Sequence, residues 1–143
     1  MLKLILAAWG LVAGTVVIHA AGLVLAIGPV FRSAALAELR FWPMTWLVIR
    51  TACWLIVIHL LEIALWALFY WWQKCLPDVE SSFYFAGVTY TTVGYGDLVL
   101  PHEWRLLGPV EGLTGILMCG LSTGFFFAMV NRIRQVRTKG AKV

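Results

Sequence analysis

The chain has 143 residues, of which 62% are hydrophobic and 13% are charged, and its mean hydropathy is +0.87. Soluble domains are near half apolar and roughly a quarter charged, so this composition excludes a soluble globular domain and indicates that lipid solvates much of the chain. The formal net charge of +4 is small, and we expect no nucleic-acid partner. The three cysteines and three histidines show no metal-like spacing, and no nucleophile–base pair is apparent, so we expect neither a cofactor nor an enzyme.

Three apolar runs each exceed the roughly 20 residues that a helix needs to cross a bilayer. The first covers residues 4–31 and is too long for the core of a signal peptide, so residues 1–31 are expected to form a retained transmembrane helix. The second covers residues 44–72, and the third covers residues 109–132 and opens with a proline at a tolerated helical position. The fold class expected is therefore an all-α membrane protein.

A cytoplasmic linker, "RSAALAELRFWP" at residues 32–43, joins the first two runs. It can form a short amphipathic helix that lies in the membrane interface and stops at Pro43. A plain polar connector remains the alternative.

Residues 81–91, "SSFYFAGVTYT", are apolar and helix-compatible but too short to span. The glycine-containing stretch "TTVGYGD" follows at residues 91–97. A short helix followed by irregular backbone is tolerated at membrane depth only where protein buries it or water lines it. We therefore expect a re-entrant loop between the second and third spans.

Basic residues are biased to one side of these spans, which predicts a cytoplasmic C-terminus and an external N-terminus. The predicted inside holds Arg32, Arg40, Arg50, Arg132, Arg134, Arg137, Lys139 and Lys142, against Lys3, Lys74 and Arg105 outside. Acidic residues are expected to gather at the outer mouth, namely Asp78, Glu80, Asp97, Glu103 and Glu111. Such a mouth would raise the local concentration of cations.

The stretch "TTVGYGD" suits a ring of backbone carbonyls that replaces the hydration shell of a cation. Pointing successive carbonyls at one axis requires alternating backbone conformations, some with positive φ, and Gly94 and Gly96 reach these without strain. Val93 and Tyr95 are expected to point away and wedge against surrounding protein. Since one loop supplies one quarter of a ring, a homotetramer is expected.

The same stretch resembles the selectivity-filter signature of the potassium channel family at every position, and "SFYFAGVTYTTVGYGDLVLP" is similar to small bacterial pore proteins and to one repeat of two-pore-domain channels. The resemblance covers residues 44–133, and it implies a potassium-selective channel in the bacterial inner membrane. The implied elements are an outer helix at 44–72, a pore helix at 81–91, a filter at 92–96 and an inner helix at 109–132. The implied K⁺ ligands are the carbonyls of Thr92, Val93, Gly94 and Tyr95, with the Thr92 hydroxyl. The first span has no counterpart in two-helix channels.

Two further features follow from the resemblance. Val88 stands where some relatives carry a buried glutamate, and Tyr84 stands where relatives often bond the filter aspartate, so we expect a Tyr84–Asp97 hydrogen bond that supports the filter. Gly120 aligns with the hinge glycine of channel inner helices. Together with Gly124 and Ala128 it forms a stripe of small residues, which is either a pore-lining face with a bend or a helix-packing face.

The basic tail at residues 134–143 is expected to anchor the last helix at the anionic leaflet, so lipid is an expected partner. Within the spans, His59 and Glu62 share one helix face, and His19 lies at similar depth in the antiparallel first span. We expect these three to form a polar cluster, either as a static hydrogen-bonded set or as a protonation switch that alters gating.

Two other functions remain open. One is a non-conducting membrane subunit that assembles with or modulates other channels, and the other is a weakly selective cation channel.

Overall fold

The computed structural model of the protein describes residues 1–31 and 41–140, which form four α-helices and no strand. In chain order these are α1 (Leu2–Phe31), α2 (Phe41–Trp72), α3 (Val79–Tyr90) and α4 (Leu107–Gly140). The long helices are long and apolar enough to cross a membrane over Leu2–Gly28, Trp42–Trp72 and Leu107–Gln135. The expected all-α fold, with three spanning helices and one short helix, is confirmed.

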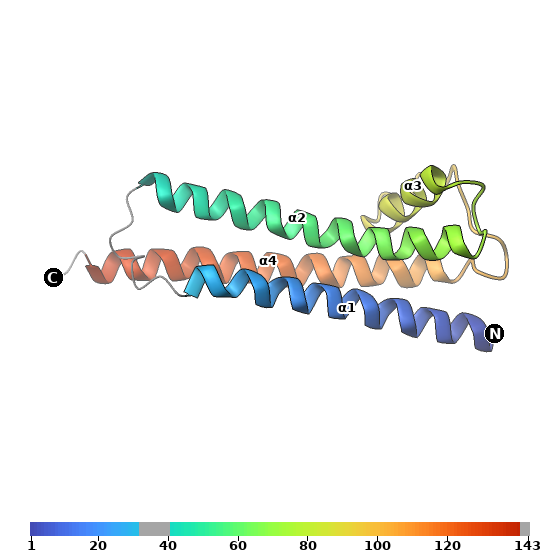
Figure 1. Cartoon of the computed structure of the whole chain (residues 1–143), viewed down its shortest axis with the longest axis horizontal. Coiled ribbons are helices and arrows are strands. Elements are labelled where there is room, and N and C mark those ends of the chain that lie inside the picture. The colour runs from blue at the N-terminus through green and yellow to red at the C-terminus, as the bar shows by residue number, and fades with distance from the viewer. Residues whose placement is uncertain (32–40, 141–143) are drawn as a thin grey trace.

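The three long helices run side by side, and α3 packs against one end of the bundle (Figure 1). In this chain α1 packs against both α2 and α4, and α3 packs against the same two helices. The N-terminus lies at the end of the bundle that carries α3, and the C-terminal end of α4 lies at the opposite end (Figure 1). This arrangement agrees with the expected topology, in which the re-entrant loop and the N-terminus share one side; which side faces the cytoplasm stays a prediction.

Helix boundaries differ from the expected ones by one to three residues, except at the end of α4, where the difference is eight. α2 begins at Phe41, so Pro43 does not stop a helix but lies in the first turn of α2, where a missing amide hydrogen does no harm. α3 and α4 each begin two residues earlier than expected. α4 also continues past Arg132 to Gly140, because no glycine or proline interrupts the polar residues between them. Residues 32–40 of the expected linker and residues 141–143 of the tail lie outside the described residues.

The larger of two buried apolar clusters lies behind α3. It draws on all four helices and includes Leu11, Trp66, Tyr70, Phe85, Tyr90 and Met118. A smaller cluster of Leu47, Met129 and Ile133 joins α2 to α4 toward the other end. Many large apolar side chains, such as Trp9 and Leu117, are instead exposed, as expected where lipid is the solvent. The larger cluster therefore packs α3, which directly precedes the loop, against the long helices.

Two indole hydrogen bonds tie α1 to α2. Trp66 Nε1 donates to Thr15 Oγ1 at 3.0 Å, and Trp54 Nε1 donates to the Gly22 carbonyl at 2.9 Å. The helices also approach closely at Gly22, where an added Cβ would lie 2.5 Å from Ile58 Cδ1. α1 is therefore packed into the fold of its own chain.

Candidate functional site

The start of α3 is set by its N-cap. Asp78 Oδ1 accepts a hydrogen bond from the Ser81 amide at 2.7 Å, and Oδ2 accepts from the Ser81 hydroxyl at 3.1 Å. This satisfies an amide that the helix itself leaves unpaired. Glu80 adds a negative charge in the first turn, where the helix dipole favours it.

The chain leaves α3 while remaining bonded to its last turn. The Thr91 amide donates to the Gly87 carbonyl at 3.1 Å, and the Thr92 amide donates to the Thr89 carbonyl at 3.0 Å. The Gly94 amide then donates to the Val88 carbonyl at 3.0 Å. The first half of "TTVGYGD" is thereby anchored to the end of α3.

Left-handed backbone recurs at every second residue of this segment. Thr92, Gly94 and Gly96 have φ of 62°, 52° and 76°, whereas Val93 and Tyr95 keep the negative φ usual for L-residues. Positive φ at the two glycines was predicted from the sequence; positive φ at Thr92 was not, and it is uncommon for a side chain branched at Cβ. Such alternation is what brings successive carbonyls to one side of an extended chain.

The side chains of Val93 and Tyr95 in this segment are not covered by the described residues of the chain. Val93 is 52% exposed and Tyr95 is 71% exposed. The expectation that both wedge against surrounding protein is therefore not met within one chain. A single loop presents its faces outward, so any protein that covers them must come from elsewhere.

The expected bond between Tyr84 and Asp97 is present. The Tyr84 hydroxyl donates to Asp97 Oδ2 at 2.8 Å, and this bond raises the pKa of Tyr84 above its usual value. Tyr84 lies on α3 and Asp97 closes the glycine-containing segment. The segment is thus bonded to α3 at two places. Backbone hydrogen bonds hold its first half, up to Gly94, and the side-chain bond from Tyr84 holds its last residue, Asp97.

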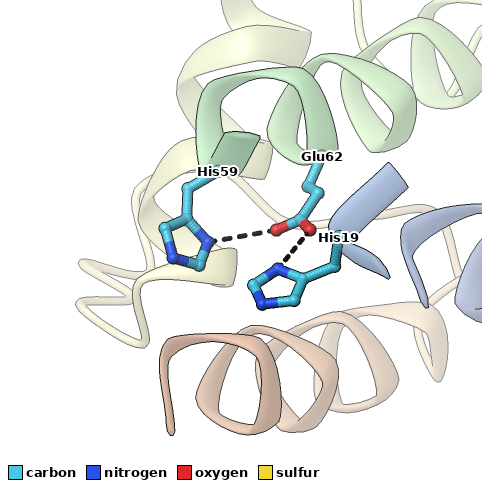
Figure 2. Close-up of side chains that lie close together, drawn as sticks. All are labelled: His19, His59 and Glu62. Carbon is cyan, nitrogen blue, oxygen red and sulfur yellow. Dashed lines mark hydrogen bonds and ion pairs between the residues drawn. The ribbon is translucent and has the colours of Figure 1, made fainter. Parts of the chain in front are cut away.

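The predicted polar cluster forms between α1 and α2, as Figure 2 shows. His19 Nδ1 lies 2.8 Å from Glu62 Oε1, and His59 Nδ1 lies 3.0 Å from Glu62 Oε2. His19 and Glu62 are buried, and His59 is partly buried. An ionised carboxylate accepts hydrogen bonds and cannot donate them, so His19 would donate from Nδ1 to an ionised Glu62, whereas a protonated Glu62 could itself be the donor. Its other nitrogen, Nε2, has no partner among the described residues.

Two further residues, which the sequence did not reveal, complete the cluster. The Tyr90 hydroxyl donates to Glu62 Oε2 and also lies 3.1 Å from His59 Nδ1. Ser122 Oγ lies 3.0 Å from His59 Nε2. The cluster therefore draws one or more residues from each of the four helices. A tyrosine in a short helix and a serine in a spanning helix are common, so neither carried a signal of its own.

The cluster also has the donor set of a small metal site, since ligand atoms of His19, His59 and Glu62 all lie within 4.8 Å of one another. Tetrahedral Zn²⁺ with Zn–N bonds of about 2.0–2.1 Å places neighbouring ligand atoms about 3.3 Å apart. The observed separations of 2.8 and 3.0 Å are those of direct hydrogen bonds. We therefore interpret the cluster as a hydrogen-bond network.

The glycines that matter for packing in α4 are not those singled out from the sequence. A Cβ on Gly115 would lie 2.1 Å from the carbonyl oxygen of Tyr90, and one on Gly112 would lie 3.4 Å from that of Thr89. A Cβ on Gly120 or Gly124 would meet nothing within 4 Å. The close approach of α3 to α4 thus depends on Gly115, and the described residues leave the surface at Gly120 and Gly124 uncovered.

Glu111 does not belong to the acidic outer mouth in which it was expected. Its side chain is buried, and its Oε2 accepts a hydrogen bond from the Tyr70 hydroxyl at 2.8 Å. Its Oε1 has no partner among the described residues. The remaining four acidic residues are exposed at this end of the molecule, namely Asp78, Glu80, Asp97 and Glu103.

A comparison with protein families gives one match. The family model described as "Ion channel" matches residues 56–132, which is more than half of the chain. The matched range begins within α2, includes α3 and the loop that follows, and ends within α4. No characterised protein and no solved structure matches the chain significantly.

Proposed function

The chain belongs to the ion channel family and is an integral membrane protein, and we propose that it conducts K⁺ selectively through a pore formed by four copies of the chain. The observation that carries the proposal is the alternation of φ through Thr92, Gly94 and Gly96 within the sequence "TTVGYGD". This backbone suits the display of consecutive carbonyls along one line, which is what dehydrated K⁺ requires.

The proposed ligands are the carbonyls of Thr92, Val93, Gly94 and Tyr95, with the Thr92 hydroxyl at the inner end. The C-terminal end of α3, at Tyr90, carries the partial negative charge of the helix dipole and would stabilise a cation nearby. The hydrogen bond between Tyr84 and Asp97 would hold the other end of the filter.

A tetramer is supported by what one chain leaves uncovered. The exposed side chains of Val93 and Tyr95 and the open surface at Gly120 and Gly124 fit contacts with neighbouring subunits or an aqueous pore. We propose a location in the bacterial inner membrane with the N-terminus outside. The basic tail would then meet anionic lipid on the cytoplasmic side.

The test is ion permeation by the purified protein in liposomes, with reversal potentials measured under opposed K⁺ and Na⁺ gradients. Strong K⁺ preference, with Rb⁺ close behind, is expected. Equal permeability to K⁺ and Na⁺ would favour a weakly selective cation channel. A purified tetramer that passes no ion under any condition would favour a non-conducting subunit.

A further inference from the structure

The buried cluster around Glu62 ends on Tyr90, which is the last residue of α3 and directly precedes the glycine-containing segment. We propose that His19 and Glu62 are positioning residues for the filter: they hold Tyr90, and with it the C-terminal end of α3, in place behind residues 92–96. This inference rests on the proposed function, and it assigns a role to α1, which lies outside the matched family range of residues 56–132.

Tyr90 is held at two points. Its hydroxyl donates to Glu62. Its backbone carbonyl packs against α4 at Gly115, where any side chain would collide with the carbonyl oxygen. Its side chain is buried between these two points. Because the Thr92 amide is bonded to the Thr89 carbonyl one residue before Tyr90, a shift of Tyr90 would move the first residue of the filter.

Glu62 can hold Tyr90 only while hydrogen bonds hold its own carboxyl group in place. The side chain is fully buried, and a buried carboxylate is strongly destabilising unless hydrogen bonds replace its hydration. His59 and Tyr90 both approach Oε2, so Oε1 depends on His19 alone. Loss of His19 would leave Oε1 without a described partner and would weaken the orientation of the whole carboxylate.

If His19 served only to hold α1 against α2, its loss would lower stability and leave the filter unchanged. A change at Thr15, which also joins α1 to α2, shows what loss of that contact alone does. Thr15 lies one helical turn before His19, is buried, and accepts the hydrogen bond of Trp66 Nε1 from α2. Within the described part of the chain, the side chain of Thr15 is bonded to Leu11 and Trp66 and not to α3. Thr15→Val therefore removes a tie between α1 and α2 without touching the path to Tyr90.

The experiment measures the K⁺/Na⁺ permeability ratio and the thermal unfolding midpoint of the full chain in liposomes for each variant. Tyr90→Phe, Glu62→Gln and His19→Leu should each lower the permeability ratio by about tenfold or more, the size expected when one hydrogen bond to a charged group is lost. His19→Asn, which keeps an N–H donor near the position of Nδ1, should recover part of the ratio. Thr15→Val should lower the unfolding midpoint and leave the ratio unchanged.

Wild-type permeability ratios for Tyr90→Phe and His19→Leu, together with a lowered unfolding midpoint, would overturn the proposal and leave the cluster a structural one. A lowered ratio for Tyr90→Phe but not for His19→Leu would likewise overturn the role of α1. If His19→Leu does not assemble, Tyr90→Phe and Glu62→Gln still test the bond between Glu62 and Tyr90, because they change almost no volume. His19→Asn then tests α1: a ratio between those of wild type and Glu62→Gln is expected, and a wild-type ratio would overturn the role of α1. A wild-type protein without K⁺ preference would instead refute the proposed function, and this inference with it.

Discussion

The carbonyl oxygen of Tyr90 and the α-carbon of Gly115 lie so close that a Cβ on Gly115 would be 2.1 Å from that oxygen. The obstructing atom belongs to the backbone and cannot rotate away. The hydroxyl of Tyr90 is bonded to Glu62, so the residue is constrained at its other end as well. The contact between α3 and α4 therefore requires a residue without a side chain at position 115.

Replacing Gly115 with alanine should displace α3 or destabilise the fold by roughly 1–3 kcal/mol, the usual size of an overpacking effect. The measurement is the thermal unfolding midpoint of the purified protein. Gly108→Ala is the matched control, because it lies on the same helix and its added Cβ would meet nothing within 4 Å. Equal midpoints for the two variants would contradict the close approach.

Replacing Gly96 with alanine should abolish K⁺ selectivity or conduction. The reason is backbone conformation and not space, since an added Cβ would meet nothing within 4 Å while φ is +76°. A left-handed φ costs an alanine roughly 1–2 kcal/mol. Gly87→Ala, in α3 and also with open space, is the control and should retain selectivity. Unchanged selectivity in Gly96→Ala would show that the filter backbone differs from the one described.

Replacing Gly120 with alanine should change the open probability and leave ion selectivity intact. Alanine favours a straight helix by about 1 kcal/mol relative to glycine, so a bend at this position would become less favourable. Apart from the neighbouring backbone of α4, no atom of the described residues lies within 4 Å of the added Cβ, so the fold of the subunit should tolerate it. Single-channel recording tests this. Wild-type gating with a less stable tetramer would favour the packing interpretation instead.

The sequence predicted the four helices because a backbone buried in a membrane must satisfy its own hydrogen bonds, which leaves few structures other than helices. Long apolar runs gave the three spans, and a short run before glycines gave α3. The largest error in a helix end, eight residues, arose because a helix can continue beyond the lipid, as α4 does from Arg132 to Gly140.

Three residues of the polar cluster were also predicted from their depth in the membrane. His19, His59 and Glu62 lie at one membrane depth, where polar groups need partners. Tyr90, Ser122 and Gly115 were missed because their roles depend on how helices are rotated against one another, and a single sequence does not report this. Glu111 was misplaced because its position near a span end suggested exposure, whereas it is buried against Tyr70.

Cys75, after α2, should react slowly with thiol reagents. Burial, together with the nearby charge of Glu103, raises the pKa of its thiol to about 11. Since the thiolate is the reactive form, labelling should be slow at neutral pH and should rise steeply toward pH 11. A variant that keeps only Cys75, with Cys53 and Cys119 changed to serine, allows the rate to be measured. Adding Glu103→Gln should speed the labelling, and fast labelling at pH 7 would contradict the described burial.

The hydrogen bond between Tyr84 and Asp97 has a defined pH range. The neutral hydroxyl is the donor, and the bond raises the pKa of Tyr84 above its usual value of 10.0. A group whose folded pKa is raised contributes stability fully below its unfolded pKa and loses it as the pH rises through the folded pKa. The support that this bond gives the filter should therefore be constant from pH 7 to pH 9 and be lost in strong alkali.

Tyr84→Phe removes the donor at every pH and should reduce K⁺ selectivity or shorten the time that the filter remains conductive. Reversal potentials and current decay in liposomes measure the two effects. Asp97→Asn keeps a carbonyl acceptor for the hydroxyl and should have the smaller effect, because only the charge on the acceptor is lost. The difference between wild type and Tyr84→Phe should be the same at pH 7 and at pH 9, since both lie below 10.0. A Tyr84→Phe channel with wild-type selectivity and current decay would show that the bond is present but does not support the filter.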